Sequence, residues 1–227
     1  MGKLMQVQEK NIKGFNLIEL LVVIAIISVI SAAAYPNFSS WKKAREVRGA
    51  AVKIKSLFTN INSQVQRGLY GFIQVEVTAS PTGGEVVVIS KGMKLSNLAQ
   101  KINNSEDVWN KDQTSRCAKD QDWDDEGNKS NKLEVNFLKF DDIAVNFEDK
   151  SGTVCFSKDG SWYSTAEEFD SSGAFYICEG KEIKCDVKDD GDPNDLNQDN
   201  LFALNWSRFG NITLEKWSKS KSEWILQ

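Results

Sequence analysis

The sequence predicts an α+β protein in which a long N-terminal helix packs on an antiparallel β-sheet body. Three features of the 227-residue chain predict this fold: an apolar segment at residues 15–35, an amphipathic pattern that continues to residue 70, and short alternating runs from residue 71 onward. The first two are typical of helices and the third is typical of strands. With 41% hydrophobic residues, the chain can bury a core of ordinary size.

The apolar segment, residues 15–35, is 21 residues long and contains one ionisable side chain, Glu19. As a helix it would span about 31 Å, which is close to the hydrocarbon thickness of a bilayer. A secretory signal peptide is a poor match, because its apolar region is shorter and ends at a small-residue cleavage site. A plain membrane anchor, oriented by the three lysines of residues 1–14, leaves Glu19 unexplained, because a carboxylate at membrane depth is costly.

The residues around this segment follow a specific order. Gly14 is followed by Phe15, Glu19 is the fifth residue counted from Phe15, and Pro36 closes the apolar run. The stretch KGFNLIELLVVIAIISVISAAAYPNF resembles the N-terminus of type IV pilins and of type II secretion pseudopilins. Asn16 departs from this family, which most often has threonine at that position.

The resemblance implies a pilin-like fold and a processed N-terminus. Residues 1–14 would be a leader that a prepilin peptidase removes after Gly14, and Phe15 would then be N-methylated. Residues 15–36 would be a helix that spans the bacterial inner membrane and later lies in a filament core, with a kink at Pro36. Because a buried amine needs a partner of opposite charge, Glu19 is expected to neutralise the Phe15 amine of a neighbouring subunit.

Beyond Pro36, the amphipathic half of the helix is expected at residues 37–70, with Gly68 and Gly71 as its end signals. Its opposite face is rich in lysine and arginine, which is typical of a solvent-exposed helix face. The apolar stripe that should pack on the body consists of Trp41, Ala44, Val47, Ala51, Ile54, Phe58, Ile61, Val65 and Leu69.

Residues 71–227 are expected to form a β-rich periplasmic body. Two stretches, TVCFSKDGSWY and FALNWSRFGNITLEKW, resemble strand pairs of GspH/FimT-like minor pilins and pseudopilins, which implies a minor, tip-associated subunit. The alternating runs predict strands at residues 72–77, 85–90, 133–140, 143–147, 153–157, 174–178, 202–206 and 211–217.

All four cysteines lie beyond the apolar segment, and an even number outside the cytoplasm is typical of disulfides. Cys178 and Cys185 flank a short hairpin-like stretch, so we expect them to pair, and Cys117 then pairs with Cys155. The sequence alone allows three connectivities. A zinc site is disfavoured, because the chain has no histidine and no C-x-x-C pair.

Two acidic stretches have oxygen ligands at alternate positions, which is the pattern that calcium prefers. Asp190, Asp192 and Asn194 fit the start of a calcium loop, and residues 120–124 hold a similar pattern. Both stretches lack the glycine and the final glutamate of a complete loop, so two solvated loops are the favoured interpretation. We therefore expect no cofactor, with calcium as the alternative.

The composition excludes several functions. A chain without histidine cannot form Ser-His-Asp or Cys-His catalytic sites. After residue 14 the chain has 25 basic and 31 acidic residues, an excess of negative charge that argues against nucleic-acid binding.

The sequence therefore predicts a non-enzymatic structural subunit of a type IV pilus or a type II secretion pseudopilus. Its expected partners are other pilin subunits, the prepilin peptidase, the membrane and the inner-membrane assembly platform. The alternative is a binding module displayed on such a filament, either an adhesin or a DNA-uptake receptor. Some relatives are thought to bind DNA through a Gly-Arg-x-Arg motif, but the corresponding residues 210–213 contain no arginine.

Overall fold

The computed structural model describes residue 14 and residues 16–104, 116–117, 134–146, 151–158, 162–164, 174–180, 184–188, 191–195, 198, 200–207 and 211–227. Residues 1–42 and 43–227 form two compact units. The first unit contains the beginning of the long helix, and the second contains the rest of that helix and the strands.

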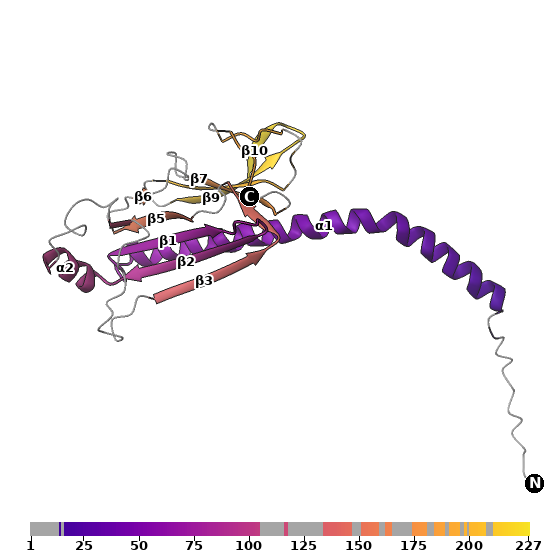
Figure 1. Cartoon of the computed structure of the whole chain (residues 1–227), viewed down its shortest axis with the longest axis horizontal. Coiled ribbons are helices and arrows are strands. Elements are labelled where there is room, and N and C mark those ends of the chain that lie inside the picture. The colour runs from indigo at the N-terminus through magenta and orange to yellow at the C-terminus, as the bar shows by residue number, and fades with distance from the viewer. Residues whose placement is uncertain are drawn as a thin grey trace, which may run out of the picture. The chain divides into compact units, whose positions relative to one another are not determined.

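The long helix, α1, runs from Leu17 to Gln66 (Figure 1). Its assignment is continuous through Pro36, so the two halves predicted from the sequence belong to one helix. The predicted kink at Pro36 stays a prediction. The helix ends four residues before the predicted boundary at residue 70.

A glycine ends α1, as the sequence predicts. Gly68 has a φ of +75°, a left-handed conformation that favours glycine. Its N–H donates to the Val65 carbonyl at 2.9 Å, and the Leu69 N–H donates to the Gln64 carbonyl at 3.1 Å. This pair of bonds is a Schellman motif, which satisfies carbonyls that the helix end would otherwise leave without donors.

The apolar stripe of α1 is buried in the second unit, apart from Ala44, which is partly exposed. The prediction is wrong for Trp41 and Leu69, whose side chains are 55% and 58% exposed. Trp41 lies in the first unit, where its ring contacts Phe38, and Leu69 lies beyond the last helical residue. The buried members of the predicted stripe are Val47, Ala51, Ile54, Phe58, Ile61 and Val65.

The strands form two five-stranded antiparallel sheets within the described residues, whereas the sequence predicted one sheet. The first sheet has the order β3-β2-β1-β5-β6, and the second has the order β10-β9-β8-β7-β4. A short helix, α2 (Leu95–Asn104), follows β2. The strands are β1 (Phe72–Ala79), β2 (Glu85–Met93), β3 (Glu134–Asp141), β4 (Ile143–Val145), β5 (Ser151–Ser157), β6 (Trp162–Ser164), β7 (Ala174–Glu179), β8 (Phe202–Trp206), β9 (Ile212–Ser218) and β10 (Glu223–Leu226).

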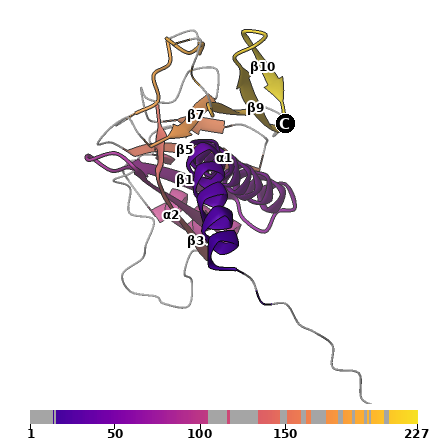
Figure 2. The same ribbon diagram turned by 90° about the vertical axis from the view of Figure 1, so that its right-hand side faces the viewer.

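The two stretches that resemble minor-pilin strand pairs do form strand pairs. In TVCFSKDGSWY, β5 pairs with β6, and in FALNWSRFGNITLEKW, β8 pairs with β9. Strand β10 adds a hairpin that was not predicted, and Figure 2 shows this β9–β10 hairpin apart from β1 and β3 of the first sheet.

Phe58 lies at the centre of the core and contacts both sheets. Its side chain is fully buried, and its ring centroid lies 5.9 Å from that of Phe156 on β5. The centroid also lies 5.8 Å from Phe175 on β7 and 5.7 Å from Trp206 on β8. One side chain of α1 thus packs against strands of both sheets, which is consistent with a single core shared by all three layers.

Two disulfides join loop segments to the sheets. Their pairings are those expected from the sequence. Cys117 is joined to Cys155 on β5, and the Gln74 side chain of β1 donates to the Cys117 carbonyl at 2.8 Å. Cys178 at the end of β7 is joined to Cys185, whose N–H donates to the Val145 carbonyl of β4 at 2.7 Å.

Truncating Phe58 should destabilise the second unit strongly. Phe58→Ala removes a ring that packs on both sheets, and such a change costs about 3–5 kcal/mol. Val52→Ala is the matched control, because Val52 lies on the same helix with its side chain 47% exposed. Chemical denaturation of the full chain in a mild non-ionic detergent measures both changes in the free energy of unfolding. Equal losses for the two variants would contradict the central role of Phe58.

The two disulfides should contribute unequally to the free energy of unfolding. The cysteines are 38 positions apart in Cys117–Cys155 and 7 apart in Cys178–Cys185. The chain-entropy relation then gives about 4 kcal/mol for the longer loop and about 2.5 kcal/mol for the shorter one. Paired Cys→Ser variants, denatured without reductant, test this order, and thiol labelling of the intact denatured chain should find no free cysteine. A larger loss from opening the shorter loop would refute the loop-length argument.

Candidate functional site

The segment that begins at Gly14 is the candidate functional site. Gly14 is exposed and lies three positions before the first residue of α1. A Cβ added at Gly14 would meet no atom within 4 Å, so the fold itself does not require glycine at this position. The described residues do not include Phe15 or residues 1–13, which form the predicted leader apart from Gly14.

Asn16 caps the start of α1. Its side-chain oxygen accepts the N–H of Ile18 at 3.5 Å, and its carbonyl accepts the N–H groups of Glu19 and Leu20 at 3.0 and 3.2 Å. Asparagine is among the best residues at a helix N-cap. Asparagine in place of threonine therefore keeps a helix cap at this position, a role that was not predicted from the sequence.

Glu19 is the third residue of α1, in its first turn. A carboxylate there interacts favourably with the helix dipole, which contributes about 0.3–1 kcal/mol. The side chain is exposed, and no ion pair of Glu19 is found among the described residues. The next charged residue along the helix is Lys42, so Glu19 is an isolated charge in an apolar stretch.

The apolar residues of the first unit are exposed on every side of the helix. Their exposed fractions run from 48% for Val23 to 77% for Leu17. Ser28 satisfies its hydroxyl within the helix, by donating to the Ile24 carbonyl at 2.7 Å. The exposed residues are Leu17, Ile18, Leu20, Leu21, Val22, Val23, Ile24, Ile26, Ile27, Val29 and Ile30.

A helix that is apolar all round is one that becomes buried. Fully burying a single leucine or isoleucine side chain contributes about 1.5–3 kcal/mol, so an apolar environment would stabilise this segment strongly. Within the part of the chain that the structure describes, no helix meets the combined length and apolarity expected of a membrane span.

The predicted calcium ligands are only partly covered by the structure. Asp190 and residues 120–124 lie outside the described residues. Asp192 accepts the Lys188 N–H at its carbonyl, at 2.8 Å, and the Asn194 side-chain amide donates to the Asp186 carboxylate. No three acidic or cysteine side chains converge among the described residues. Calcium binding by this loop stays a prediction.

Comparison with known proteins points to the same N-terminal segment. Residues 10–35 match the family described as the prokaryotic N-terminal methylation motif. The chain is 40% identical over 47 residues to the type IV major pilin protein PilA of Myxococcus xanthus (strain DK1622), which is 21% of each chain. It is 36% identical over 56 residues to a fimbrial protein of Pseudomonas aeruginosa, which is 25% of this chain and 36% of that protein.

These matches leave most of each protein uncovered. The chain spans about a fifth and about a third of the length of these two relatives. No solved structure is a significant match to the chain. The methylation motif of residues 10–35 and the partial likeness to a major pilin show that this chain is similar to type IV pilins.

Proposed function

We propose that this protein is a structural subunit of a type IV pilus or type II secretion pseudopilus. The observation that carries the proposal is the coincidence of two features in one segment. Residues 10–35 match the methylation motif, and the part of α1 that lies within that match exposes apolar side chains on all its faces. A helix of this kind fits the core of a filament, where neighbouring helices supply the apolar environment.

The proposal gives residues 1–14 the role of a leader. A prepilin peptidase hydrolyses the bond between Gly14 and Phe15, and the new amine of Phe15 then receives a methyl group. The surroundings of Gly14 support this step, because the glycine is exposed and unconstrained by the fold. The need for glycine then arises from the peptidase, because its cleft is expected to be too narrow for a larger side chain at this position.

Before assembly, the proposal places the apolar half of α1 in the bacterial inner membrane and the body in the periplasm. The sequence supports this proposal through the 21-residue apolar segment and the lysines that precede it. The disulfides of the second unit suit an oxidising compartment such as the periplasm. The inner-membrane assembly platform would then move the processed subunit into the filament.

Glu19 would guide this assembly by charge pairing. Cleavage creates a positive amine at Phe15, immediately before a helix whose exposed surface is apolar. When that helix is buried among others, the amine needs a negative partner, since leaving one charge of a buried pair unmatched costs about 3–5 kcal/mol. Glu19 of a neighbouring subunit is suited to this task, because it is exposed and makes no ion pair among the described residues.

Within the filament, we assign the subunit to a minor, tip-associated position. The support is the likeness of two sequence stretches to minor pilins, together with the strand pairs β5–β6 and β8–β9 that those stretches form. The proposed role is structural, and no catalytic step is assigned to the chain.

The identity of the N-terminal residue in cells tests whether residues 1–14 are a cleaved leader. In cells with an active prepilin peptidase, mass spectrometry of the extracted protein should find N-methyl-Phe15 at the N-terminus. Gly14→Val should block cleavage, because a branched side chain would not fit a cleft that admits glycine. Asn16→Thr is the matched control and should be cleaved normally, since threonine also caps helices. An intact Met1 terminus in the unchanged protein would refute the proposal.

Glu19 variants test the pairing mechanism. Glu19→Ala and Glu19→Gln should still reach the membrane, because removing a charge makes the segment more apolar. Crosslinking to partner pilins should fall at least 100-fold, as the cost of an unmatched buried amine far exceeds the helix-dipole contribution of Glu19. Ser28→Ala, in the same apolar stretch, should assemble normally. Normal assembly of Glu19→Ala at an unchanged membrane level would show that the carboxylate has no pairing role.

A further inference from the structure

The two ends of the second unit differ in charge. Residues 43–66 of α1 belong to this unit and span roughly 35 Å, at about 1.5 Å per helical residue. The first sheet lies along this part of α1 (Figure 1). Its turns and strand ends therefore gather in two places, one where α1 enters the unit and one where α1 stops.

The place where α1 stops is called the basic end here. The N–H of Gly71 donates to the Met93 carbonyl at 2.9 Å, which joins the start of β1 to the end of β2. On the other side of β1, Phe72 pairs with Ser157, the last residue of β5. Three segments meet at this end, and they contain five basic residues and no acidic one. The segments are residues 67–72, 91–104 and 157–158, and the basic residues are Arg67, Lys91, Lys94, Lys101 and Lys158.

Three cations of the basic end are exposed and make no ion pair in the part of the chain that the structure describes: Arg67, Lys94 and Lys158. Lys94 and Lys158 follow the two strands that flank β1, and strands two apart in a sheet are about 10 Å from each other. A Cβ added at Gly68 would lie 3.6 Å from the Lys158 ammonium nitrogen, so this cation lies beside the residue that follows Arg67. The three cations are therefore neighbours.

The place where α1 enters the second unit is called the acidic end. Lys43, the first residue of the unit, lies 3.1 Å from the Glu179 carboxylate at the end of β7. The next residue, Gly180, donates its N–H to the Asp142 carbonyl at 2.8 Å, and a Cβ added at Gly180 would lie 2.9 Å from Gly84. Three segments meet at this end, and they contain four acidic residues and no basic one. The segments are residues 79–85, 141–143 and 179–180, and the acidic residues are Glu85, Asp141, Asp142 and Glu179.

Two carboxylates of the acidic end are left without a matching cation. The two glutamates pair with Lys43 and Lys139. Asp141 and Asp142 are exposed, and neither makes an ion pair among the described residues. The hydrogen bond to Glu85, and then the negative charges of Glu85 and Asp141, raise the pKa of Lys139, as expected where negative charge is in excess.

The opposite ends of one molecule cannot neutralise each other. Their separation of roughly 35 Å is several times the Debye length, which is about 8 Å at physiological salt. The ends can meet only when a second copy of the chain brings its acidic end to the basic end of the first. A contact between two different surface patches is heterologous, and when repeated without closure it generates a helical filament.

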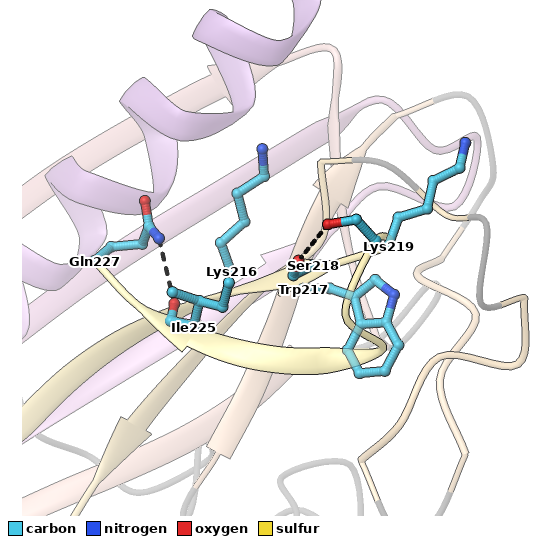
Figure 3. A pocket seen from close by; sticks show the side chains of 7 residues that line it. Lys216, Trp217, Ser218, Lys219, Ile225 and Gln227 are labelled. Carbon is cyan, nitrogen blue, oxygen red and sulfur yellow. Dashed lines mark hydrogen bonds between the residues drawn. The ribbon is translucent and has the colours of Figure 1, made fainter.

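Basic residues elsewhere in the second unit lie outside the basic end. Figure 3 shows the side chains of Lys216 and Lys219 extending in the same direction from the β9–β10 hairpin. This hairpin belongs to the second sheet, whereas the basic end consists of parts of the helices and of the first sheet. Lys53 lies on α1, 14 positions before Arg67, and it is exposed and makes no ion pair among the described residues. Lys53 therefore offers a matched control cation.

We propose that the acidic end of one subunit docks on the basic end of a second copy of this chain, so that Asp141 and Asp142 face Arg67, Lys94 and Lys158. This inference rests on the proposed function, because a filament is the assembly that places copies head to tail. It adds a contact between bodies to the helix contacts proposed above. Because the two ends have opposite charge, the contact forms only when both chains point in the same direction.

The test is zero-length carbodiimide crosslinking, which joins a carboxylate to an amine only where the two groups are in contact. Isotopically labelled and unlabelled full chains are mixed in a non-ionic detergent, with several chains in each micelle to raise their effective concentration. We expect crosslinks of Asp141 or Asp142 to Lys94 or Lys158 between a labelled and an unlabelled chain. Their yield should fall at least fivefold in about 1 M salt, where the Debye length is about 3 Å.

Arg67 variants isolate the effect of charge, because arginine takes no part in this crosslinking chemistry. Arg67→Glu should lower the yield of the crosslinks between the two ends at least fivefold, and Arg67→Lys should retain it within twofold. Lys53→Glu, which changes the net charge by the same amount, should leave the yield unchanged. The melting temperature verifies that each variant is folded.

Two results would overturn the inference. The first is the absence of crosslinks between the acidic end of one chain and the basic end of another. The second is an equal loss for Lys53→Glu and Arg67→Glu, which would indicate a diffuse charge effect. The methylation of Phe15 and the Glu19 variants report on the proposed function separately, so normal processing and assembly without this contact would refute the inference alone.

Discussion

The organisation of the second unit depends on the contact of Phe58 with both sheets. The ring of Phe58 meets Phe156 in the first sheet and Phe175 and Trp206 in the second, so the three layers share one core. Because this contact uses one face of α1, the helix presents its other face to the outside. The same helix continues toward its N-terminus as a segment with no covered face at all. The helix α1 thus contributes to the core of the body with one half, and its other half needs an apolar environment that this chain does not supply.

The fold could be predicted from the sequence wherever a local pattern decides it. The stripe of α1, the glycine that ends it and most strands follow from spacing and turn residues. The division into two sheets could not be predicted, because it depends on which strands pair across long separations. Strands β3 and β4 are separated only by Asp142, yet they belong to different sheets. Asp142 has a φ of +59°, and this bend in the backbone has no signature in the alternation of side chains.

The N-terminal site could be predicted from the sequence because Gly14, Phe15 and Glu19 lie within six positions of one another. The surroundings of Lys216 could not be predicted, because charge on a strand cannot be counted along the chain. In the sequence, Glu215 lies next to Lys216 and would cancel its charge. In the structure, adjacent strand residues point to opposite faces, so Glu215 accepts a hydrogen bond from Asn205 at 3.2 Å while Lys216 lies over Phe202. Charge on a strand has to be counted one face at a time.

The core contact between Phe58 and Trp206 also has a consequence for the order of folding. These two residues are separated by 148 positions, and the ribosome makes the helix long before it makes β8. The part of the apolar stripe that packs on β8 therefore has no partner until nearly the whole chain has been synthesised. Closing so long a loop is entropically costly, which places the body among proteins of high contact order that fold slowly. Over that interval this part of the stripe is exposed to solvent and prone to aggregation, so the synthesis of the last strands determines when the core of the body is complete.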